Sequence, residues 1–390
     1  MKIANVVLNP FTRDNRVLKM ARTLQEAGHD VTVFALSGPG LPERETRPEG
    51  WKVQRIPIGS DRLPRSPIFG AIKFSELIVR VVRMTRSAEI MHCNDVEAYV
   101  IGLFAKAINR ELRLVYDCHE YEAERIGKPE WQKTIIRWIE RRFIHHADAV
   151  LMVSPSIAQA YREDYGPKRV SKTWLVRNAP DPDPHVQALS SGESPSYFRD
   201  HFDISEEAMI FLYQGSLSRD RGIEHLVEAM SILTSTRDDI HMVFMGFGRL
   251  ESWLVKLAEE RKHIHFHPAV DYEKVLAISA SADVGIVSAQ PTCKNHLFCL
   301  PNKLFEYIQA GIPVLSNALV DAKSLLLQYG AGVAVDADTP DSWAQAMIHM
   351  RETPLDDWRA GAQRAGAEIN WPTEARQLLA AYREVISSMT

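Results

Sequence analysis

Short apolar segments alternate with amphipathic segments along almost the whole chain. The apolar segments have the composition of strands that are buried on both faces, as in parallel sheets. The amphipathic segments between them suit the helical crossovers that parallel strands require. The pattern therefore predicts an α/β protein built from doubly wound parallel sheets.

The alternation runs in two series. In the first series we expect strands at residues 3–8, 31–34, 53–57, 90–93, 114–117, 149–153 and 174–177. In the second series we expect strands at residues 209–213, 241–245, 264–266, 284–287, 314–315 and 333–335. Terminal signals also place helices: Gly28 ends one over 16–27, and Thr339 followed by Pro340 begins one over 341–350. A third helix is expected over 223–233.

A stretch rich in Asp, Pro, Ser and Gly, from Asn178 to about Ser196, interrupts the rhythm and is typical of a linker. A chain of 390 residues is also too long for one ordinary core. We therefore expect a first Rossmann-like domain at 1–178, a linker at 179–202 and a second Rossmann-like domain at 203–370. The final segment, 371–390, contains a helix over 373–386.

Ligands of doubly wound sheets bind outside the carboxyl ends of the strands. Segment 300–314 reads LPNKLFEYIQAGIPV and places a polar turn before a helix whose fifth residue is Glu306. A helix that begins after such a turn offers free backbone N–H groups to an anion. A carboxylate one turn further on can accept hydrogen bonds from sugar hydroxyls. These are the groups that would hold a nucleotide sugar, although an isolated Glu306 would be an ordinary exposed helix carboxylate.

Two further loops of the second half follow expected strands. Segment 213–222, YQGSLSRDRG, contains Gly215 and places Arg221 near a helix start, where it could pair with a diphosphate or remain a solvated loop arginine. Segment 245–248, MGFG, contains Gly246 and Gly248. A GxG turn alone is weak evidence.

The order of these three segments resembles the donor site of GT-B glycosyltransferases, specifically the retaining family 4-like group with a PNK-x-FEY segment. The resemblance implies two Rossmann-like domains that face a central cleft, with the final helix crossing back to the first domain. It implies donor contacts from Gly215, Arg221, Gly246, Gly248, His267, Leu300, Pro301, Asn302, Lys303 and Glu306. Arg221 would bind the diphosphate, Glu306 the ribose, and the strand end at His267 the base.

The chain departs from the family pattern at two positions. Many members carry an arginine where this chain has Ser216, so Arg219, Lys294 or Lys303 would have to supply a second positive charge. Members with a full E-x7-E element carry a glutamate at the position of Phe298. Sugar recognition would then fall to backbone groups around 298–301 and to Asn302.

Polar residues also follow strands of the first half. In segment 117–120, DCHE, His119 matches a histidine that contacts the donor sugar near the reacting centre in related enzymes, although it could be a structural histidine. Asn94 and Asp95 match an acceptor-side pair, and we place Glu120 on the same side. We expect His119, Asp95 and Arg221 to be the catalytic residues.

Arg16 belongs to a D-x-R-V segment after the first strand. A cation at a helix start opposes the helix dipole, so Arg16 is expected either to contact an anion or the acceptor, or to pair with Asp14 or Asp30. His92, inside a strand, is expected to be packed.

Charge and apolar character suggest further contacts. Residues 1–180 hold 29 Lys and Arg against 21 Asp and Glu, a net charge of +8, and the remainder carries −12 of the total −4. Segments 68–86 and 131–144 mix bulky apolar residues with Lys and Arg, so they could lie weakly on an anionic membrane or could pack one face on a sheet. The negative total charge argues against nucleic acid. The four cysteines lack a CxxC pair, and we expect free thiols in a cytoplasmic protein, peripheral at most on the inner membrane face.

The predicted function is transfer of a sugar from a nucleoside diphosphate sugar to a hydroxyl acceptor, such as a glycan or a lipid-linked precursor of a surface polysaccharide. We expect no cofactor and no metal, since no DxD-type motif lies in a suitable loop and the alternating His263, His265 and His267 lack an Asp or Cys at ligand spacing. Two alternatives remain: a nucleotide-sugar 2-epimerase and a non-catalytic glycosyltransferase-like subunit.

Overall fold

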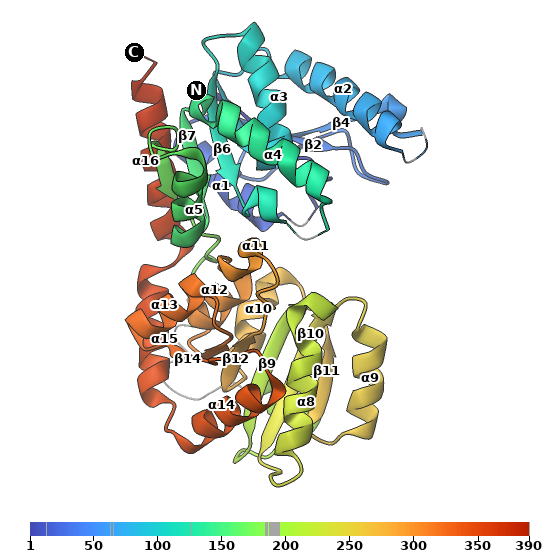
Figure 1. The fold of residues 1–390 in the computed structure, drawn as a ribbon, viewed down its shortest axis with the longest axis vertical. Coiled ribbons are helices and arrows are strands. Elements are labelled where there is room, and N and C mark those ends of the chain that lie inside the picture. The colour runs from blue at the N-terminus through green and yellow to red at the C-terminus, as the bar shows by residue number, and fades with distance from the viewer. Residues whose placement is uncertain are drawn as a thin grey trace. The chain divides into compact units, whose positions relative to one another are not determined.

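The computed structural model describes residues 1–12, 14–62, 64, 66–125, 127–183, 186 and 196–389. The chain divides into two compact units (Figure 1). Unit 1 comprises residues 1–177 and 374–390, and unit 2 comprises residues 178–373. The expected linker lies partly outside the described residues, at 184, 185 and 187–195. The last part of the expected linker instead forms helix α7 (Tyr197–Phe202). Phe198 on this helix is buried in the core of unit 2.

Unit 1 contains an eight-stranded sheet in the order β3-β4-β2-β1-β5-β6-β7-β8. Its strands are β1 (Lys2–Val6), β2 (Asp30–Leu36), β3 (Arg44–Thr46), β4 (Lys52–Ile56), β5 (Ile90–Asn94), β6 (Arg113–Cys118), β7 (Ala149–Met152) and β8 (Thr173–Leu175). All seven expected strands are present. The sequence pattern missed β3, a three-residue edge strand that pairs antiparallel with β4, because so short an exposed strand shows no apolar run.

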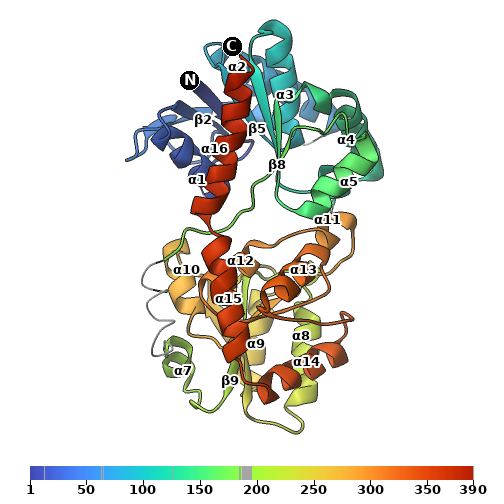
Figure 2. The same cartoon turned by 90° about the vertical axis from the view of Figure 1, so that its left-hand side faces the viewer.

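Helices connect the parallel strands of unit 1: α1 (Asn15–Glu26), α2 (Pro67–Met84), α3 (Asp95–Ile108), α4 (Glu130–Phe143) and α5 (Pro155–Tyr165), with 3-10 turns η1 (Gly59–Arg62), η2 (Glu122–Glu124) and η3 (Ile144–His146). Helix α16 (Trp371–Ser387) is the red helix that runs beside unit 1 (Figure 2). It docks there through Tyr382, whose buried hydroxyl lies 2.8 Å from His92 Nδ1.

Unit 2 contains a six-stranded parallel sheet in the order β11-β10-β9-β12-β13-β14. The strands are β9 (Met209–Ser216), β10 (Ile240–Phe247), β11 (Ile264–Pro268), β12 (Val284–Val287), β13 (Val314–Ser316) and β14 (Gly332–Ala334). The six expected strands are therefore all present. The strand order is that of a Rossmann sheet, with its switch point between β9 and β12. In unit 1 the switch point lies between β1 and β5.

Helices cover the unit 2 sheet in two groups: α8 (Ile223–Leu233), α9 (Glu251–Glu260) and α14 (Pro340–Glu352) in one, and α10 (Tyr272–Ser279), α12 (Asn302–Gln309), α13 (Val320–Tyr329) and α15 (Asp356–Glu368) in the other. Turn η4 (Arg219–Arg221) and helix α11 (Lys294–Leu297) are short. Alternate side chains of β9 enter opposite cores: Ile210 and Leu212 join one, and Phe211 and Tyr213 join the other. This alternation explains the continuous apolar run in the sequence.

No helix among the described residues is both long enough and apolar enough to cross a bilayer.

Candidate active site

The loops after β9 and β12 meet at the switch point of the unit 2 sheet. The loop after β9 leads through η4 to α8, and Ser288 follows β12 directly. Ser288 Oγ donates a 2.7 Å hydrogen bond to the carbonyl oxygen of Arg221. Gly222, which precedes α8, has φ +69°, and a Cβ there would lie 2.6 Å from the Ser288 carbonyl oxygen. The close approach of the two loops therefore depends on glycine at this position.

Lys303 brings a positive charge to the same strand end. It is the second residue of α12, and its Nζ lies 3.5 Å from the centroid of the Tyr213 ring. Its last methylene and its Nζ lie 3.7 Å from where a Cβ of Gly215 would stand. Burial, followed by the charge of Arg221, lowers the pKa of Lys303 well below its ordinary value. An anion bound here would be expected to stabilise the ammonium form.

The structure separates the three candidates for the second positive charge. Only Lys303 of the three contacts Gly215 among the described residues. The Arg219 side chain is 89% exposed, and Lys294 lies in the first turn of α11. Arg221 is one-third exposed, its Nε lies 3.5 Å from Asp220 Oδ2, and its charge acts on Lys303 and on Tyr213. The Lys303 amine and the Arg221 guanidinium therefore influence each other at the same strand end.

Glu306 lies one turn further along α12, and a residue of β9 holds its carboxylate by a hydrogen bond. Gln214, a buried residue of β9, donates through Nε2 to Glu306 Oε2 at 2.6 Å. Gln214 Oε1 in turn accepts a hydrogen bond from the hydroxyl of Ser279, which is fully buried. Tyr307 OH accepts from the Gln214 backbone N–H and donates to the carbonyl of Leu212, both at 2.9 Å. The carboxylate orientation is therefore fixed by β9.

Two helices at this strand end begin without a side-chain cap. The residue before α12 is Pro301, and the residue before α8 is Gly222; neither provides a side-chain hydrogen bond. Such helix starts carry partial positive charge. Leu300 is buried in the core, while the exposed Asn302 accepts a 3.0 Å hydrogen bond from Asn178 Nδ2 through Oδ1.

Gly246 lies near the end of β10 and Gly248 follows the strand directly, and both have a packing role. A Cβ on Gly246 would lie 1.9 Å from the carbonyl oxygen of Gly215, and one on Gly248 would lie 2.4 Å from that of Leu217. A side chain at either position would clash with the neighbouring backbone, so the close approach of the two segments requires glycine at both positions. A nucleotide contact from them remains a prediction.

His267 at the end of β11 is buried, and both ring nitrogens have partners within the chain. Nε2 lies 2.8 Å from Tyr197 OH on α7, and Nδ1 lies 2.6 Å from the carbonyl oxygen of Pro268. A contact from the His267 ring to a nucleotide base would have to replace one of these partners. The base contact of His267 stays a prediction.

His263 and His265, which alternate with His267 in the sequence, form a separate cluster with His241 of β10. His241 Nδ1 lies 2.9 Å from His265 Nε2, and the His241 and His263 rings are 5.0 Å apart. Burial lowers the pKa of His241 and of His265 to about 4, so both rings are neutral at pH 7. Within the described part of the chain, no group of three or more His, Cys, Asp and Glu has the arrangement of a metal site.

The second set of candidate residues lies at the strand ends of unit 1. Asn94 is the last residue of β5, and its amide donates to Asn5 Oδ1 at 2.6 Å and to the Val6 carbonyl at 2.8 Å. Asp95 begins α3 with φ +66°, a conformation that costs energy for a residue other than glycine. Strain of this kind is often found at functional sites. Asn94 is buried, whereas the Asp95 side chain is 31% exposed.

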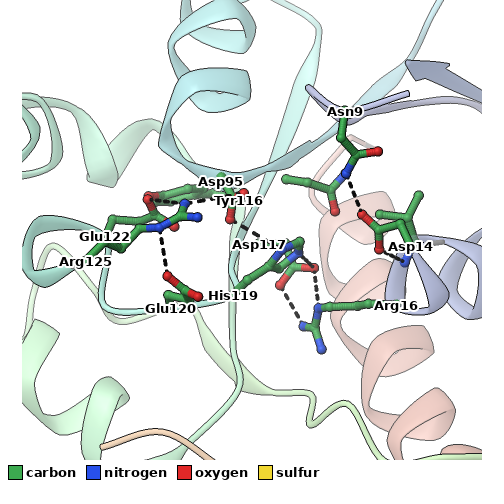
Figure 3. A network of polar contacts seen from close by, with 12 residues as sticks. Asn9, Asp14, Arg16, Asp95, Tyr116, Asp117, His119, Glu120, Glu122 and Arg125 are labelled. Atoms are coloured by element: carbon green, nitrogen blue, oxygen red, sulfur yellow. Dashed lines mark hydrogen bonds and ion pairs between the residues drawn. The ribbon is translucent and has the colours of Figure 1, made fainter. Parts of the chain in front are cut away.

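His119 lies between two carboxylates (Figure 3). Its Nε2 lies 3.1 Å from Asp117 Oδ2, and its Nδ1 lies 3.3 Å from Asp95 Oδ1. Burial would lower the pKa of His119, but the charges of Asp117 and Asp95 outweigh burial and raise it. The imidazolium, with both nitrogens donating, is the form that this arrangement favours.

Arg16 pairs with Asp117 instead of with Asp14 or Asp30. Its Nε and Nη2 donate to the two oxygens of Asp117 at 2.9 and 2.7 Å, and Nη1 donates to the Val176 carbonyl at 2.8 Å. Asp14 instead caps α1 by accepting from the Val17 N–H. Arg16 is 5% exposed, so the anion that it meets is Asp117 and its predicted contact with an acceptor is not supported by its burial.

Arg125 connects the remaining carboxylates of this cluster (Figure 3). Its Nε lies 2.7 Å from Glu120 Oε2, and its Nη1 lies 3.4 Å from Glu122 Oε2 and 3.7 Å from Asp95 Oδ2. Glu120 is 43% exposed, whereas Glu122 is fully buried and burial raises its pKa well above the usual value. Asp95 and Glu120 therefore both form ion pairs with the guanidinium of Arg125.

Sequence reasoning missed the buried residues that hold the candidate side chains in position through hydrogen bonds. Asp117, Gln214 and Ser279 are buried polar residues in or next to apolar segments. A polar residue inside a buried strand requires a hydrogen-bond partner. A polar residue within an apolar segment could therefore have indicated these positions from the sequence. The identity of each partner could not be read from the sequence, because Arg16 and Asp117 are 101 residues apart.

The two units together define a protein of two Rossmann-like domains, each with polar side chains gathered at the carboxyl ends of its strands. Residues 14–175 match the glycosyl transferase 4-like domain family, and residues 208–353 match the family of glycosyl transferases group 1. The chain belongs to the GT-B glycosyltransferases of this family 4-like group.

Relatives and solved structures agree with this assignment. The chain is 24% identical over 344 residues to an uncharacterised glycosyltransferase of Methanocaldococcus jannaschii, covering 87% of this chain and 84% of the relative. The structure of sucrose-phosphate synthase from Thermosynechococcus elongatus superposes with a TM-score of 0.78 at 17% identity, over 100% of both chains. HepE from Anabaena, solved with UDP-glucose, gives a TM-score of 0.70 at 17% identity, also over 100% of both chains.

Proposed function

We propose that the protein transfers a sugar, with retention of configuration, from a nucleoside diphosphate sugar to a hydroxyl of a glycan or of a lipid-linked precursor of a surface polysaccharide. The observation that carries the donor half is the convergence of Lys303, Arg221 and Glu306 at one strand end of unit 2. Two cations and two uncapped helix starts suit a diphosphate, and a fixed carboxylate suits the hydroxyl pair of a ribose.

In this proposal unit 2 supports the departure of the leaving group. Negative charge develops on the diphosphate oxygen as the glycosidic bond breaks, and Lys303 and Arg221 are placed to stabilise that charge. The same two cations make metal-independent transfer a reasonable proposal. In unit 1, His119 and Asp95 are proposed to contact the reacting sugars, and Asn94 and Glu120 to lie on the acceptor side.

Comparison with HepE supports a nucleotide-sugar donor, since that protein was solved with UDP-glucose and with UDP. Retention is proposed from the resemblance to the family 4-like group.

A thermal-shift panel with UDP, GDP, dTDP, ADP and CMP tests the donor site. A nucleotide at about 100 times its dissociation constant should stabilise the protein by roughly 2.7 kcal/mol. The shift should disappear in Glu306→Ala, which removes the carboxylate proposed to hold the ribose. Glu273→Ala, which removes an exposed glutamate from the first turn of α10, is the matched control and should leave the shift unchanged.

The outcomes also separate the alternatives. No shift with any nucleotide would contradict the donor site and favour a non-catalytic subunit. Consumption of a nucleotide sugar with epimerisation and without an acceptor would indicate the 2-epimerase. Equal shifts in the wild type and in Glu306→Ala would remove Glu306 from the site.

We also propose weak peripheral contact with an anionic membrane leaflet, through α4 of unit 1. Trp131, Ile135 and Trp138 lie at helical spacing and are 57%, 47% and 62% exposed, and we call them the α4 tryptophan face. Ile136 and Glu140 on the same helix are buried, so α4 packs on the unit through a different face. Arg141 and Arg142 lie in its last turn. Exposed tryptophans flanked by arginines suit the lipid interface.

A further inference from the structure

Asp117 is a fully buried carboxylate that the proposed function does not use. It is the fifth residue of β6, and its two oxygens meet three side chains from different parts of unit 1. Arg16 comes from α1, His92 from β5, and His119 from the segment after β6. Burying a charge costs desolvation free energy, and these specific partners offset that cost.

The orientation of the Asp117 carboxylate is fixed by Arg16. The guanidinium binds both oxygens in a bidentate arrangement, which defines the plane of the carboxylate. The third donor of Arg16, Nη1, binds the Val176 carbonyl, so the guanidinium is itself held by the chain just before it leaves unit 1. Burial alone would raise the pKa of Asp117, but Arg16 and His119 outweigh burial and hold it well below its usual value.

Asp117 presents one oxygen, Oδ2, to His119 Nε2 at 3.1 Å. The opposite nitrogen of the ring faces Asp95 Oδ1. The ring therefore has one deeply buried partner whose position is fixed and one partly exposed partner on the strained first residue of α3. His92 Nε2 lies 3.4 Å from the same Oδ2, and burial lowers the pKa of His92, so this second ring is neutral. The charged groups that face His119 are thus Asp117, Asp95 and Arg16.

We propose that Asp117 is a positioning residue for the transfer reaction: with Arg16 it fixes the ring of His119 between its own carboxylate and that of Asp95. This inference rests on the proposed function. It adds the residue that fixes the position of the His119 ring and favours its protonated form. A histidine whose two N–H groups both face carboxylates cannot act as a general base. Its role is then that of a fixed cation that orients Asp95.

The test is Asp117→Asn, which preserves the shape of the side chain and removes its charge. Three readouts are compared with the wild type: the titration of the His119 ring by NMR with isotope-labelled histidine, assigned with His119→Gln; the release of UDP or GDP from UDP-glucose or GDP-mannose; and the nucleotide-induced thermal shift. We expect the His119 pKa to fall, and kcat to fall by roughly 10- to 100-fold, the range found when a carboxylate that orients a metal-bound histidine is removed. The nucleotide-induced shift, which reports on unit 2, should persist.

The pH profile separates positioning from a structural role. If the imidazolium is the active form, activity of the wild type falls as pH rises through the raised pKa of His119. The fall should begin at lower pH in Asp117→Asn. The matched control is Asp148→Asn, which removes the charge from another largely buried carboxylate of unit 1, one that pairs with Lys106 and Arg113. This control should lower the free energy of unfolding without moving the His119 titration.

If Asp117→Asn does not fold, Arg16→Lys tests the positioning alone, because it keeps a cation and the Asp117 carboxylate and removes the bidentate contact. In Arg16→Lys, kcat should fall while the His119 titration stays, and an unchanged kcat would overturn the proposal. In Asp117→Asn, an unchanged His119 titration would overturn it whether or not activity is lost, because Asp117 would then have a structural role only. Failure of the proposed function is distinguishable, since the wild type itself would then show neither a nucleotide-induced shift nor release of nucleotide.

Discussion

At the residue scale, two of the candidate side chains, Glu306 and His119, are each held by a buried polar partner. Glu306 is held by Gln214, which is held by Ser279. His119 is held by Asp117, which is held by Arg16. A side chain held in this way loses little conformational freedom when a ligand binds, so the site is organised in advance.

Lys303 leads to a pH prediction at this scale. Its pKa in the free protein is lowered, chiefly by burial, and a bound diphosphate would favour the ammonium form. Binding should therefore take up a proton in the pH range between the lowered pKa and the pKa of the complex. Affinity for the diphosphate nucleotide should fall as pH rises through this range, by at most about tenfold per pH unit, as for linkage to one proton. Calorimetric titration at several pH values measures this slope.

Lys303→Arg is the control for this prediction. A guanidinium stays charged over the whole range, so the affinity of this variant should depend little on pH. A wild-type affinity that does not change with pH would show that Lys303 is already protonated in the free protein, or that its ammonium does not meet the diphosphate.

At the scale of elements, helix α4 combines a buried face with the exposed α4 tryptophan face. The buried face contributes Glu140, whose carboxylate accepts hydrogen bonds from Tyr116, Tyr161 and Tyr165 at 2.6 to 2.8 Å. These bonds attach α4 to β6 and α5. The exposed apolar side chains therefore stay in place on a firmly attached helix, where they could meet a surface.

The membrane contact is tested with vesicles. The wild type should sediment with vesicles that contain phosphatidylglycerol and less with vesicles of phosphatidylcholine alone, because the arginines of α4 favour anionic lipid. Replacing Trp131 and Trp138 together by Ser should release the protein. Trp253→Ser is the control, because Trp253 is 36% exposed on α9 of unit 2. Sedimentation that is equal for both variants would contradict a role for the α4 tryptophan face.

At the scale of the whole molecule, the chain passes between the units twice, and the two crossings are joined within unit 1. Glu374, where α16 returns, is 1% exposed and accepts 2.8 Å hydrogen bonds from the backbone N–H and the Nε of Arg177. Arg177 is the last residue before the chain leaves unit 1. The preceding residue, Val176, binds Arg16. The crossing is therefore connected to the network around His119 through consecutive residues.

Glu374→Ala should destabilise unit 1 by about 2 kcal/mol. The substitution leaves a partly buried guanidinium and a backbone N–H without their acceptor, and Arg177 keeps some access to water, which moderates the cost. Urea unfolding measures the change. Glu384→Ala, at an exposed position of the same helix, should change stability by less than about 0.5 kcal/mol. Equal effects of the two variants would show that the contact at the crossing contributes nothing.

Much of the fold was predictable because strands and crossover helices follow from local periodicity. The strand of residues 209–213, for example, is apolar on both faces because each face enters a separate core. The donor segment was also predictable, since the turn, the helix start and Glu306 lie within one short stretch. The role of Arg16 was not, because Asp14 and Asp30 are near in sequence whereas its partner Asp117 is near only in space.

The sequence by itself determined the order of strands and helices, the two Rossmann-like sheets and the family, because these depend on the period of apolar residues and on motifs of adjacent residues. Tertiary structure alone decided which polar groups meet: Gln214 with Glu306 across 92 residues, and His92 with Tyr382 across 290. The physical reason is that a buried polar group must find a hydrogen-bond partner, while the chain fold selects which partner comes within reach.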